Sequence, residues 1–192
     1  DVFKTIHLAS RRIESCEKVA KRCKGKVHTH QVDADNVAGT IALIKKTKPH
    51  LVINMALPYQ DLAIMDACLK TGVHYMDTAN YEPRDEAKFT YKYQWPYHEK
   101  FAKKGIMAIL GCGFDPGQSN IYCAYAQEFL FDEIETIDII DCNDGSHGKA
   151  FATNFNPEIN LREVTQRGKY WKDGKWIEID ALSINCMIDY PE

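Results

Sequence analysis

The sequence predicts an α/β protein, in which a doubly wound parallel sheet is followed by the start of an α+β domain with an antiparallel sheet. Strand-like and helix-like segments alternate with short loops up to residue 111, which is the pattern of parallel strands joined by crossover helices. Beyond residue 111 the chain has a long alternating segment and a hairpin pattern, and these indicate antiparallel strands. We therefore expect one domain over residues 1–111 and the start of a second domain over residues 112–192.

The expected elements of the first domain follow from apolar spacing and from residues that start or stop helices. The segment 37–47 has helical spacing, and either Asp35 or Asn36 can cap it. Gly72 is placed to end the helix expected over 59–71. The apolar segment 50–56 is typical of a strand buried on both faces of a parallel sheet. Strands are expected at 3–9, 26–34, 50–56, 73–79 and 106–111, and helices at 12–23, 37–47, 59–71 and 97–105.

Two patterns predict the antiparallel region. Residues 132–144 alternate between apolar and polar side chains, which predicts a strand. Residues 169–180 predict a hairpin, because Asp173-Gly174 is a strong turn pair between two strand-like runs. Trp171 and Trp176 flank this turn, so we expect their rings to pair across the two strands.

Composition argues against several classes of protein. The 192 residues carry a net charge of -3, which argues against a nucleic-acid or membrane-surface protein. No apolar run reaches the roughly 18 residues that a membrane span needs. The seven cysteines form no C-x-x-C pairs, and His28 and His30 have no third ligand at matching spacing. We therefore expect a cytoplasmic protein with reduced thiols and no metal site.

The end of the first expected strand indicates a nucleotide-binding edge. The sequence lacks the G-x-G-x-x-G motif that follows the first strand of a dinucleotide fold, so the run 3–9 corresponds to the second strand of such a fold. An arginine at that edge accommodates a ribose 2′-phosphate. Ser10 can donate a hydrogen bond, and Arg11 can bind phosphate through two parallel ones. The alternative is that Ser10 caps the next helix and that Arg11 and Arg12 are simply solvated.

The other strand ends carry small or polar residues, and ligands bind outside the carboxyl ends of the strands in an open parallel sheet. We expect Asp33 to meet an adenine edge, Ala56–Pro58 to let a cofactor ribose approach, and Thr78–Asn80 to lie near a nicotinamide. The candidate cofactor-binding residues are Ser10, Arg11, Asp33, Ala56, Leu57, Pro58, Thr78, Ala79, Asn80, Gly113 and Phe114.

Three long stretches resemble the saccharopine dehydrogenase-like family. They are "LVINMALPYQDLAIMDACLKTGVHYMDTANYEP", "ILGCGFDPGQSNIYCAYA" and "FATNFNPEINLREVTQRGKYWKDGKW". Within that family they are most similar to the carboxynorspermidine (carboxyspermidine) dehydrogenases of polyamine biosynthesis. Family members are longer and open with the glycine-rich loop. The resemblance therefore implies a Rossmann-type domain lacking its first strand in this chain, followed by a substrate and dimerisation domain that continues further.

The resemblance also implies a reaction and its partners. A diamine condenses with aspartate semialdehyde, and NADPH reduces the resulting imine to a secondary amine. The protein is then expected to be a homodimer that binds neither nucleic acid nor membrane. Two other interpretations stay open: a saccharopine dehydrogenase of lysine metabolism, or a non-catalytic binding module with the same fold. A saccharopine site needs additional cationic residues, whereas the segment 141–162 is rich in acids and amides.

The turn "GCGFDPG" is the strongest candidate for the reacting centre. Gly113 and Gly117 are expected to let the backbone approach a ligand closely. Asp115 and Pro116 are expected to start a helix whose amides face the site. Asp115 is the catalytic candidate, because a carboxylate there can stabilise an iminium ion or orient its proton. The alternative is that Asp115 only caps the helix.

A substrate with ammonium groups and a carboxylate needs partners of both charges. Carboxylates and amides of the second domain are expected to meet the amines, and Arg162 the carboxylate. Ordinary loop polarity is the alternative for each of them. The candidate substrate-binding residues are Asp144, Asn154, Asn156, Glu158 and Arg162.

Overall fold

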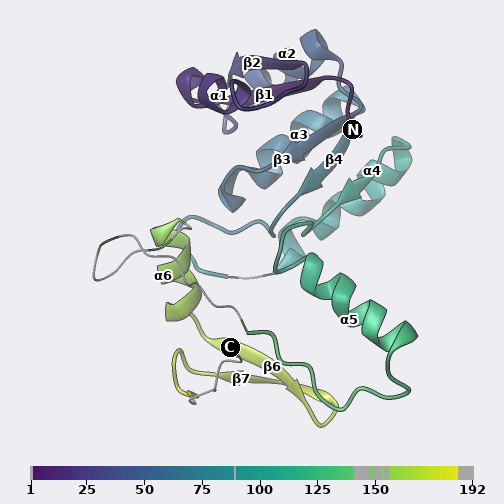
Figure 1. The fold of residues 1–192 in the computed structure, drawn as a ribbon, viewed down its shortest axis with the longest axis vertical. Helices are drawn as coiled ribbons and strands as arrows, with labels where there is room; N and C mark the ends of the chain where they lie inside the picture. The colour runs from purple at the N-terminus through teal and green to yellow at the C-terminus, as the bar shows by residue number, and fades with distance from the viewer. Residues whose placement is uncertain (1, 89, 141–147, 149–152, 154–155, 186–192) are drawn as a thin grey trace. The chain divides into compact units, whose positions relative to one another are not determined.

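The computed structural model describes residues 2–88, 90–140, 148, 153 and 156–185. The chain forms two compact units (Figure 1). The first unit consists of Asp1–Glu82 and Phe89–Ile137, and the second of Pro83–Lys88 and Asp138–Glu192. The division that the sequence suggests at residues 111 and 112 remains a prediction.

The first unit alternates strands and helices, as the sequence predicts (Figure 1). Its elements are β1 (Ile6–Ser10), α1 (Ile13–Ala20), β2 (Val27–Gln31), α2 (Val37–Thr47), β3 (Leu51–Asn54), the 3₁₀ turn η1 (Pro58–Gln60), α3 (Asp61–Thr71), β4 (His74–Asp77), the 3₁₀ turns η2 (Tyr91–Tyr93) and η3 (Trp95–Tyr97), α4 (His98–Lys103), β5 (Ala108–Ile109) and α5 (Gln118–Phe129).

All strand pairs of this unit are parallel, which confirms the predicted sheet type. β1 pairs with β2, and β3, β4 and β5 form a second sheet in that order. Among the described residues no strand joins β1 to β3. In the doubly wound strand order 3-2-1-4-5-6 the position between them belongs to the first strand, which is the strand that the sequence predicts to be missing from this chain.

The helix boundaries show how local chemistry sets an element. The range of α2 coincides with the expected 37–47, and the Asn36 side chain accepts a hydrogen bond from the Gly39 amide at 3.0 Å. Gly72 ends α3 in the left-handed conformation, with φ of 74°. The expected burial of 50–56 on both faces is wrong at Ile53 and Met55, which are 42% and 80% exposed, because β3 lies at the edge of its sheet and ends at Asn54.

The hydrophobic core lies between α2, α3, α4 and β4, and α3 packs on β3 and β4. Its members are fully apolar or carry one polar tip, as Tyr75 does, and their burial is the main stabilising term of the unit. The buried core residues are Ile44, Ile64, Met65, Ala67, Cys68, Tyr75 and Phe101.

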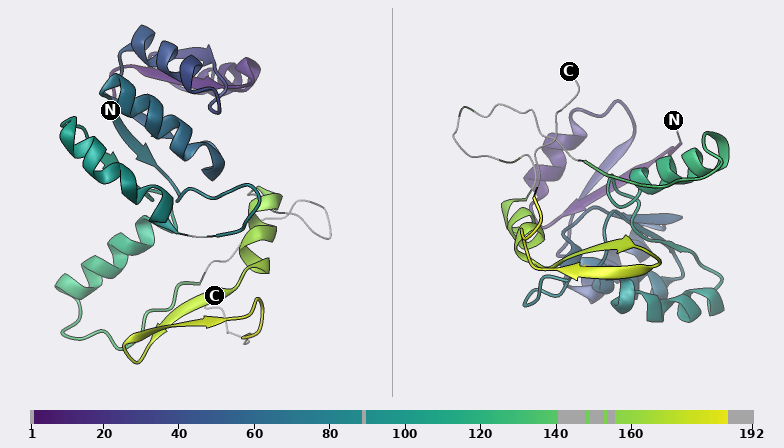
Figure 2. Two further views of the ribbon diagram at one scale, coloured as in Figure 1. Left: turned by 180° about the vertical axis from the view of Figure 1, so that it is seen from behind. Right: turned by 90° about the horizontal axis from the view of Figure 1, so that it is seen from below.

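The second unit contains α6 (Pro157–Thr165) and the hairpin of β6 (Gly168–Lys172) and β7 (Lys175–Ile179). Figure 2 shows the hairpin as two antiparallel arrows joined by a tight turn. Asp173 and Gly174 both have positive φ, as a type I′ turn requires. The predicted ring pair is confirmed: Trp171 lies opposite Trp176, with centroids 5.3 Å apart.

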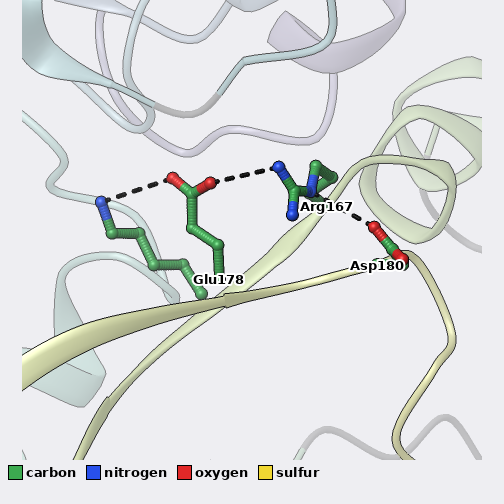
Figure 3. Close-up of polar contacts among 4 residues, drawn as sticks. Arg167, Glu178 and Asp180 are labelled. Carbon is green, nitrogen blue, oxygen red and sulfur yellow. Dashed lines mark hydrogen bonds and ion pairs between the residues drawn. The ribbon is translucent and has the colours of Figure 1, made fainter.

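Charged side chains line one side of this hairpin (Figure 3). Arg167 lies 3.4 Å from both Glu178 and Asp180, and Lys169 lies 3.9 Å from Glu178. All of these side chains are largely exposed, so each pair contributes no more than about 1 kcal/mol.

The strand expected over 132–144 is wrong for residues 132–140, which form no regular structure; residues 141–144 lie outside the described part. An alternating pattern becomes a strand only where a neighbouring strand takes its hydrogen bonds, and no described strand pairs with this segment. Ile137, Ile139 and Ile140 are exposed as a result. None of the described helices combines the length and hydropathy that a membrane span needs.

Candidate functional site

The candidate site lies in the first unit, where the strands end and their loops begin. β1 ends at Ser10, β3 at Asn54 and β4 at Asp77. Hydrogen bonds tie neighbouring strand ends together, from β1 to β2 and from β3 through β4 to the loop after β5. This carboxyl edge is where the sequence predicts a ligand.

The end of β1 carries two predicted cofactor-binding residues, Ser10 and Arg11. The Ser10 hydroxyl accepts a hydrogen bond from the Arg12 amide at 3.3 Å, and the Arg11 carbonyl accepts one from Gln31 at 2.9 Å. Arg12 is the N-cap of α1, and its side chain makes no capping bond. The exposed Arg11 guanidinium forms no hydrogen bond or ion pair with any residue that the structure describes, so it is open to an anion.

The loops after β2 and β3 are joined to each other. Asp33 accepts a hydrogen bond from the Asp35 amide at 3.1 Å, and the Gln60 side chain donates to the Asp35 carboxylate at 3.3 Å. The Ala56 amide donates to the Asn54 side chain at 3.0 Å. Ala56 is exposed, Leu57 precedes η1 and Pro58 begins it, so small apolar atoms do lie at this edge.

A buried polar network lies beneath these loops. Asn54 donates to Asp61 at 2.7 Å and to the Tyr75 hydroxyl at 3.2 Å. Asp77 accepts from the Gly111 amide at 2.6 Å and from Gln94 at 2.7 Å. Asp61 is 2% exposed and Asp77 1%. Two buried carboxylates of like charge cannot both ionise cheaply in such a place.

One proton is therefore expected to stay on Asp61. Burial, and then the charge of Asp77, raises the pKa of Asp61 to about 8. Burial also raises the pKa of Asp77, but hydrogen bonds from Gly111, Tyr75 and Gln94 favour its ionised form. Asp61 accepts a hydrogen bond from Asn54, while its Oδ2 has no partner among the described residues. Asp77 accepts hydrogen bonds from more donors than Asp61 does, so Asp77 carries the charge.

The turn after β5 packs against the chain itself. A Cβ on Gly113 would lie 2.3 Å from the Thr78 carbonyl oxygen, and a Cβ on Gly117 would lie 2.3 Å from the carbonyl oxygen of Gly113. The sequence led us to expect that these glycines let the backbone approach a ligand. The structure gives a further reason for them, since they let the turn close on itself and on the end of β4, and their approach to a ligand remains a prediction.

Asp115 lies at the exposed tip of this turn. It accepts a hydrogen bond from the Ser119 hydroxyl at 2.9 Å, and its neighbour Phe114 is 67% exposed. The helix expected to start at Asp115 and Pro116 begins later, because α5 has Gly117 as its N-cap and starts at Gln118. The Gly117 amide bonds to the Asn120 side chain at 3.0 Å.

The structure brings the nicotinamide candidates next to this turn. Thr78 approaches Gly113 through its carbonyl, and the Cys112 amide donates to the Asp77 carbonyl at 2.8 Å. Ala79 follows Thr78 and is half-buried. Asn80 is buried and bonds to the Tyr81 carbonyl at 3.1 Å. The residues around 78 and 113 therefore form one continuous part of the edge.

An apolar groove of about 1020 Å³ lies behind the turn in the same unit. Tyr91, Trp95 and Phe101 line it, together with Gly111 and Ile121. Gly113 of the turn lines it as well, so the groove adjoins the candidate site, although neither Asp115 nor Thr78 lines it.

The substrate candidates belong to the second unit, where the described ones already have partners. Asn156 caps α6, accepting hydrogen bonds from the amides of Glu158 and Ile159. Glu158 is exposed in the first turn of that helix. Arg162 donates to the carbonyls of Pro83, Arg84 and Glu86 at 2.6, 3.0 and 2.7 Å. Asp144 and Asn154 lie outside the described residues, and all five assignments remain predictions.

Asp61, Tyr75 and Gln94 are site residues that the sequence did not single out. Asp61 begins an apolar helix, where an acid is ordinarily explained by the helix dipole. Gln94 lies in a polar stretch rich in tyrosine. Only the fold shows that these side chains are buried against Asp77.

The fold and this edge define a doubly wound α/β domain of the dinucleotide-binding type. The chain belongs to the family described as "Saccharopine dehydrogenase NADP binding domain", which matches residues 1–109. It also resembles a solved structure of apo saccharopine dehydrogenase (L-Glu forming) from Saccharomyces cerevisiae. The TM-score is 0.65 at 15% sequence identity, over 97% of this chain and 42% of that chain, and this likeness shows the fold.

Relatives from bacteria are more similar in sequence. A carboxyaminopropylagmatine dehydrogenase from Synechocystis sp. is 55% identical over 190 residues, which is 98% of this chain and 48% of the relative. A carboxynorspermidine synthase from Vibrio cholerae is 40% identical over 205 residues, covering all of this chain and 50% of the relative. The chain thus spans about half the length of these relatives.

Proposed function

We propose that this chain is part of an NADP-dependent oxidoreductase of polyamine biosynthesis. The reaction is the reduction of the imine that aspartate semialdehyde forms with an amine. Family membership supports NADP as the cofactor, and the names of both relatives support a carboxyalkylated polyamine as the product.

The exposed Arg11 guanidinium at the carboxyl end of β1 carries this proposal. A guanidinium at this strand end suits a ribose 2′-phosphate, and Ser10 lies beside it. The donor set therefore fits the phosphorylated cofactor. Asp33 is then available to the adenine, and Ala56, Leu57 and Pro58 offer small atoms to a ribose. When bound, NADPH supplies the hydride that reduces the imine carbon.

The remaining roles fall on the turn and the end of β4. Thr78, Ala79, Asn80, Gly113 and Phe114 hold the nicotinamide end and keep water from it. The Asp115 carboxylate, steadied by Ser119, stabilises the positive charge of the iminium and orients its proton. Precise placement of these groups is the main contribution that a protein makes to such a reaction.

The identity of the amine is inferred from the names of the relatives. The two relatives are named for different polyamine products, and the relative with the higher identity is named for an agmatine product. We therefore infer that agmatine is the preferred amine, ahead of putrescine and diaminopropane. Asp144, Asn154, Asn156 and Glu158 are proposed to meet its cationic groups, and Arg162 the carboxylate.

The test is a reductase assay on the intact protein that contains this chain. NADPH oxidation is followed with aspartate semialdehyde and each of the amines agmatine, putrescine and diaminopropane. We expect turnover with at least one amine, and the highest kcat/KM with agmatine. Activity only with saccharopine and NADP would replace the proposal by the saccharopine dehydrogenase interpretation. Absence of NADPH binding would leave the non-catalytic binding module.

Sedimentation equilibrium on the same sample tests the expected homodimer.

A further inference from the structure

The Asp77 carboxylate connects segments that are far apart in the sequence. Its Oδ1 accepts from the Gly111 amide at 2.6 Å, and its Oδ2 accepts from the Gln94 side chain at 2.7 Å. Gln94 in turn accepts a hydrogen bond from the Tyr81 amide at 2.9 Å. The end of β4, the first residue of the turn after β5, and the loop at Tyr81 therefore meet at this one side chain.

Among the described residues, the groups that hydrogen-bond to this carboxylate are all donors, while the Asp61 carboxyl group interacts with it through charge. The amide of Gly111 and the amide group of Gln94 can only donate in these contacts, and the Tyr75 hydroxyl donates as well. Such an arrangement suits an ionised carboxylate and gives short, charge-assisted hydrogen bonds. Both Asp77 and Gln94 are 1% exposed, so water cannot replace a bond that is lost.

The bond to Gly111 acts where the turn begins. Gly111 has φ of 66°, and a Cβ there would lie 2.3 Å from the Tyr91 hydroxyl, so the backbone at this point has little freedom. The Cys112 amide is held by the Asp77 carbonyl at 2.8 Å. The carboxylate and carbonyl of one residue thus set the direction in which the turn leaves β5.

We propose that Asp77 is a positioning residue, which together with Gln94 aims the turn that carries Asp115. The catalytic consequence rests on the proposed function, whereas the structural consequence does not. Asp77 contacts neither substrate nor cofactor in this proposal. It acts through Gly111 and through the loop that Gln94 holds.

The test exchanges the polarity of the Asp77–Gln94 pair in the intact protein. D77N places an amide donor against the Gln94 donor, and Q94E places a second carboxylate against Asp77. In the double variant D77N/Q94E, the contact with Gly111 is kept, because the new amide oxygen at position 77 accepts from the Gly111 amide. The new amide nitrogen at that position donates to the glutamate introduced at position 94. The buried charge is the same as in the wild type.

We expect each single variant to lose about 10- to 100-fold in kcat, with a smaller change in the KM for NADPH. The double variant should recover most of that loss. D66N is the matched control, because Asp66 lies on α3 and accepts a hydrogen bond from Tyr97, and this change should leave kcat unchanged. Wild-type kcat in both single variants would overturn the proposal, and so would a double variant no better than the worse single one.

Amide signals of Gly111 and Cys112 give a readout that does not depend on activity. In the NMR spectrum of the intact protein we expect faster hydrogen exchange at both amides in each single variant and restored protection in the double variant. Where a single variant does not fold, the double variant decides: recovery of folding and protection supports the proposal, and failure overturns it. If the wild type reduces no imine, the proposed function fails and these amide signals still test the inference.

Discussion

Substitution of Arg11 is the most direct test of whether the cofactor is NADPH. R11A removes a guanidinium that is open to a phosphate, so NADPH affinity should fall by about 10- to 100-fold while NADH affinity changes little. Fluorescence titration of the intact protein with each cofactor measures both. R22A, which removes an exposed arginine just beyond α1, should change neither affinity. An equal loss for NADPH and NADH would refute the 2′-phosphate assignment.

Asp115 is exposed and bonded only to Ser119 among the described residues. D115N keeps the shape of the side chain and removes its charge, so we expect kcat to fall about 100-fold with little change in NADPH affinity. Steady-state kinetics and a cofactor titration separate these effects. D132N serves as the control for the loss of an exposed carboxylate. Unchanged turnover in D115N would reduce its role to holding Ser119.

Gly113 tests the close packing of the turn. In G113A the new methyl group meets the Thr78 carbonyl. Such overpacking should lower the free energy of unfolding by about 1–3 kcal/mol. G25A is the matched control, since nothing lies within 4 Å of a Cβ at that position. Urea unfolding of the two variants should give a lower midpoint for G113A alone. Equal midpoints would mean that the turn has room for a methyl group at position 113.

At the scale of elements, local sequence predicts best where the chemistry is local. The range of α2 follows from its apolar spacing and from Asn36, which bonds to an amide of the first turn. The hairpin follows from Asp173 and Gly174, whose backbone adopts the required positive φ. The alternating run 132–140 fails, because a strand needs a partner that the run itself does not specify.

Asp61 begins α3 and accepts a hydrogen bond from Asn54 of β3, and its pKa predicts how the stability of the protein depends on pH. The pKa of Asp61 is raised from 3.8 to about 8 in the folded protein. Between these values the folded state keeps a proton that the unfolded state has lost, so the free energy of unfolding falls as pH rises. The stabilisation that comes from the proton on Asp61 is fully present below about pH 4 and is lost once the pH has passed about 8.

D61N should therefore flatten the dependence of the free energy of unfolding on pH between about 4 and 8. Urea unfolding at a series of pH values measures it. The remaining slope belongs to Asp77, whose pKa is raised in the same direction, and to other groups. A slope in D61N as steep as the wild type would mean that Asp61 does not hold the proton.

At the scale of the whole molecule, residues 83–88 interrupt the first unit along the chain and belong to the second. Arg162 explains this assignment, because its guanidinium donates to three carbonyls of that segment. The planar fork of arginine can serve several acceptors at once, which a lysine cannot.

R162A should release the segment and increase tryptic cleavage after Arg84 and Lys88 by at least about tenfold, since the hydrogen bonds to all three carbonyls are lost. Limited proteolysis of the intact protein followed by mass spectrometry measures the rate. R167A, which removes an arginine from the exposed ion pairs of the hairpin, should be cleaved like the wild type. If R162A is cleaved at the wild-type rate, the three bonds do not hold the segment.

The sequence by itself determined the alternation of strands and helices, the caps of α2 and α3, the hairpin and the resemblance to the family. Each of these depends on residues within a few positions of one another, where spacing, turn chemistry and capping act. Tertiary structure alone decided that Asp77 meets Gly111 and Gln94, that Ile53 lies on an edge strand, and that Arg162 binds residues 83–86. These contacts join residues tens of positions apart, and local propensity carries no information about which distant groups will be buried together.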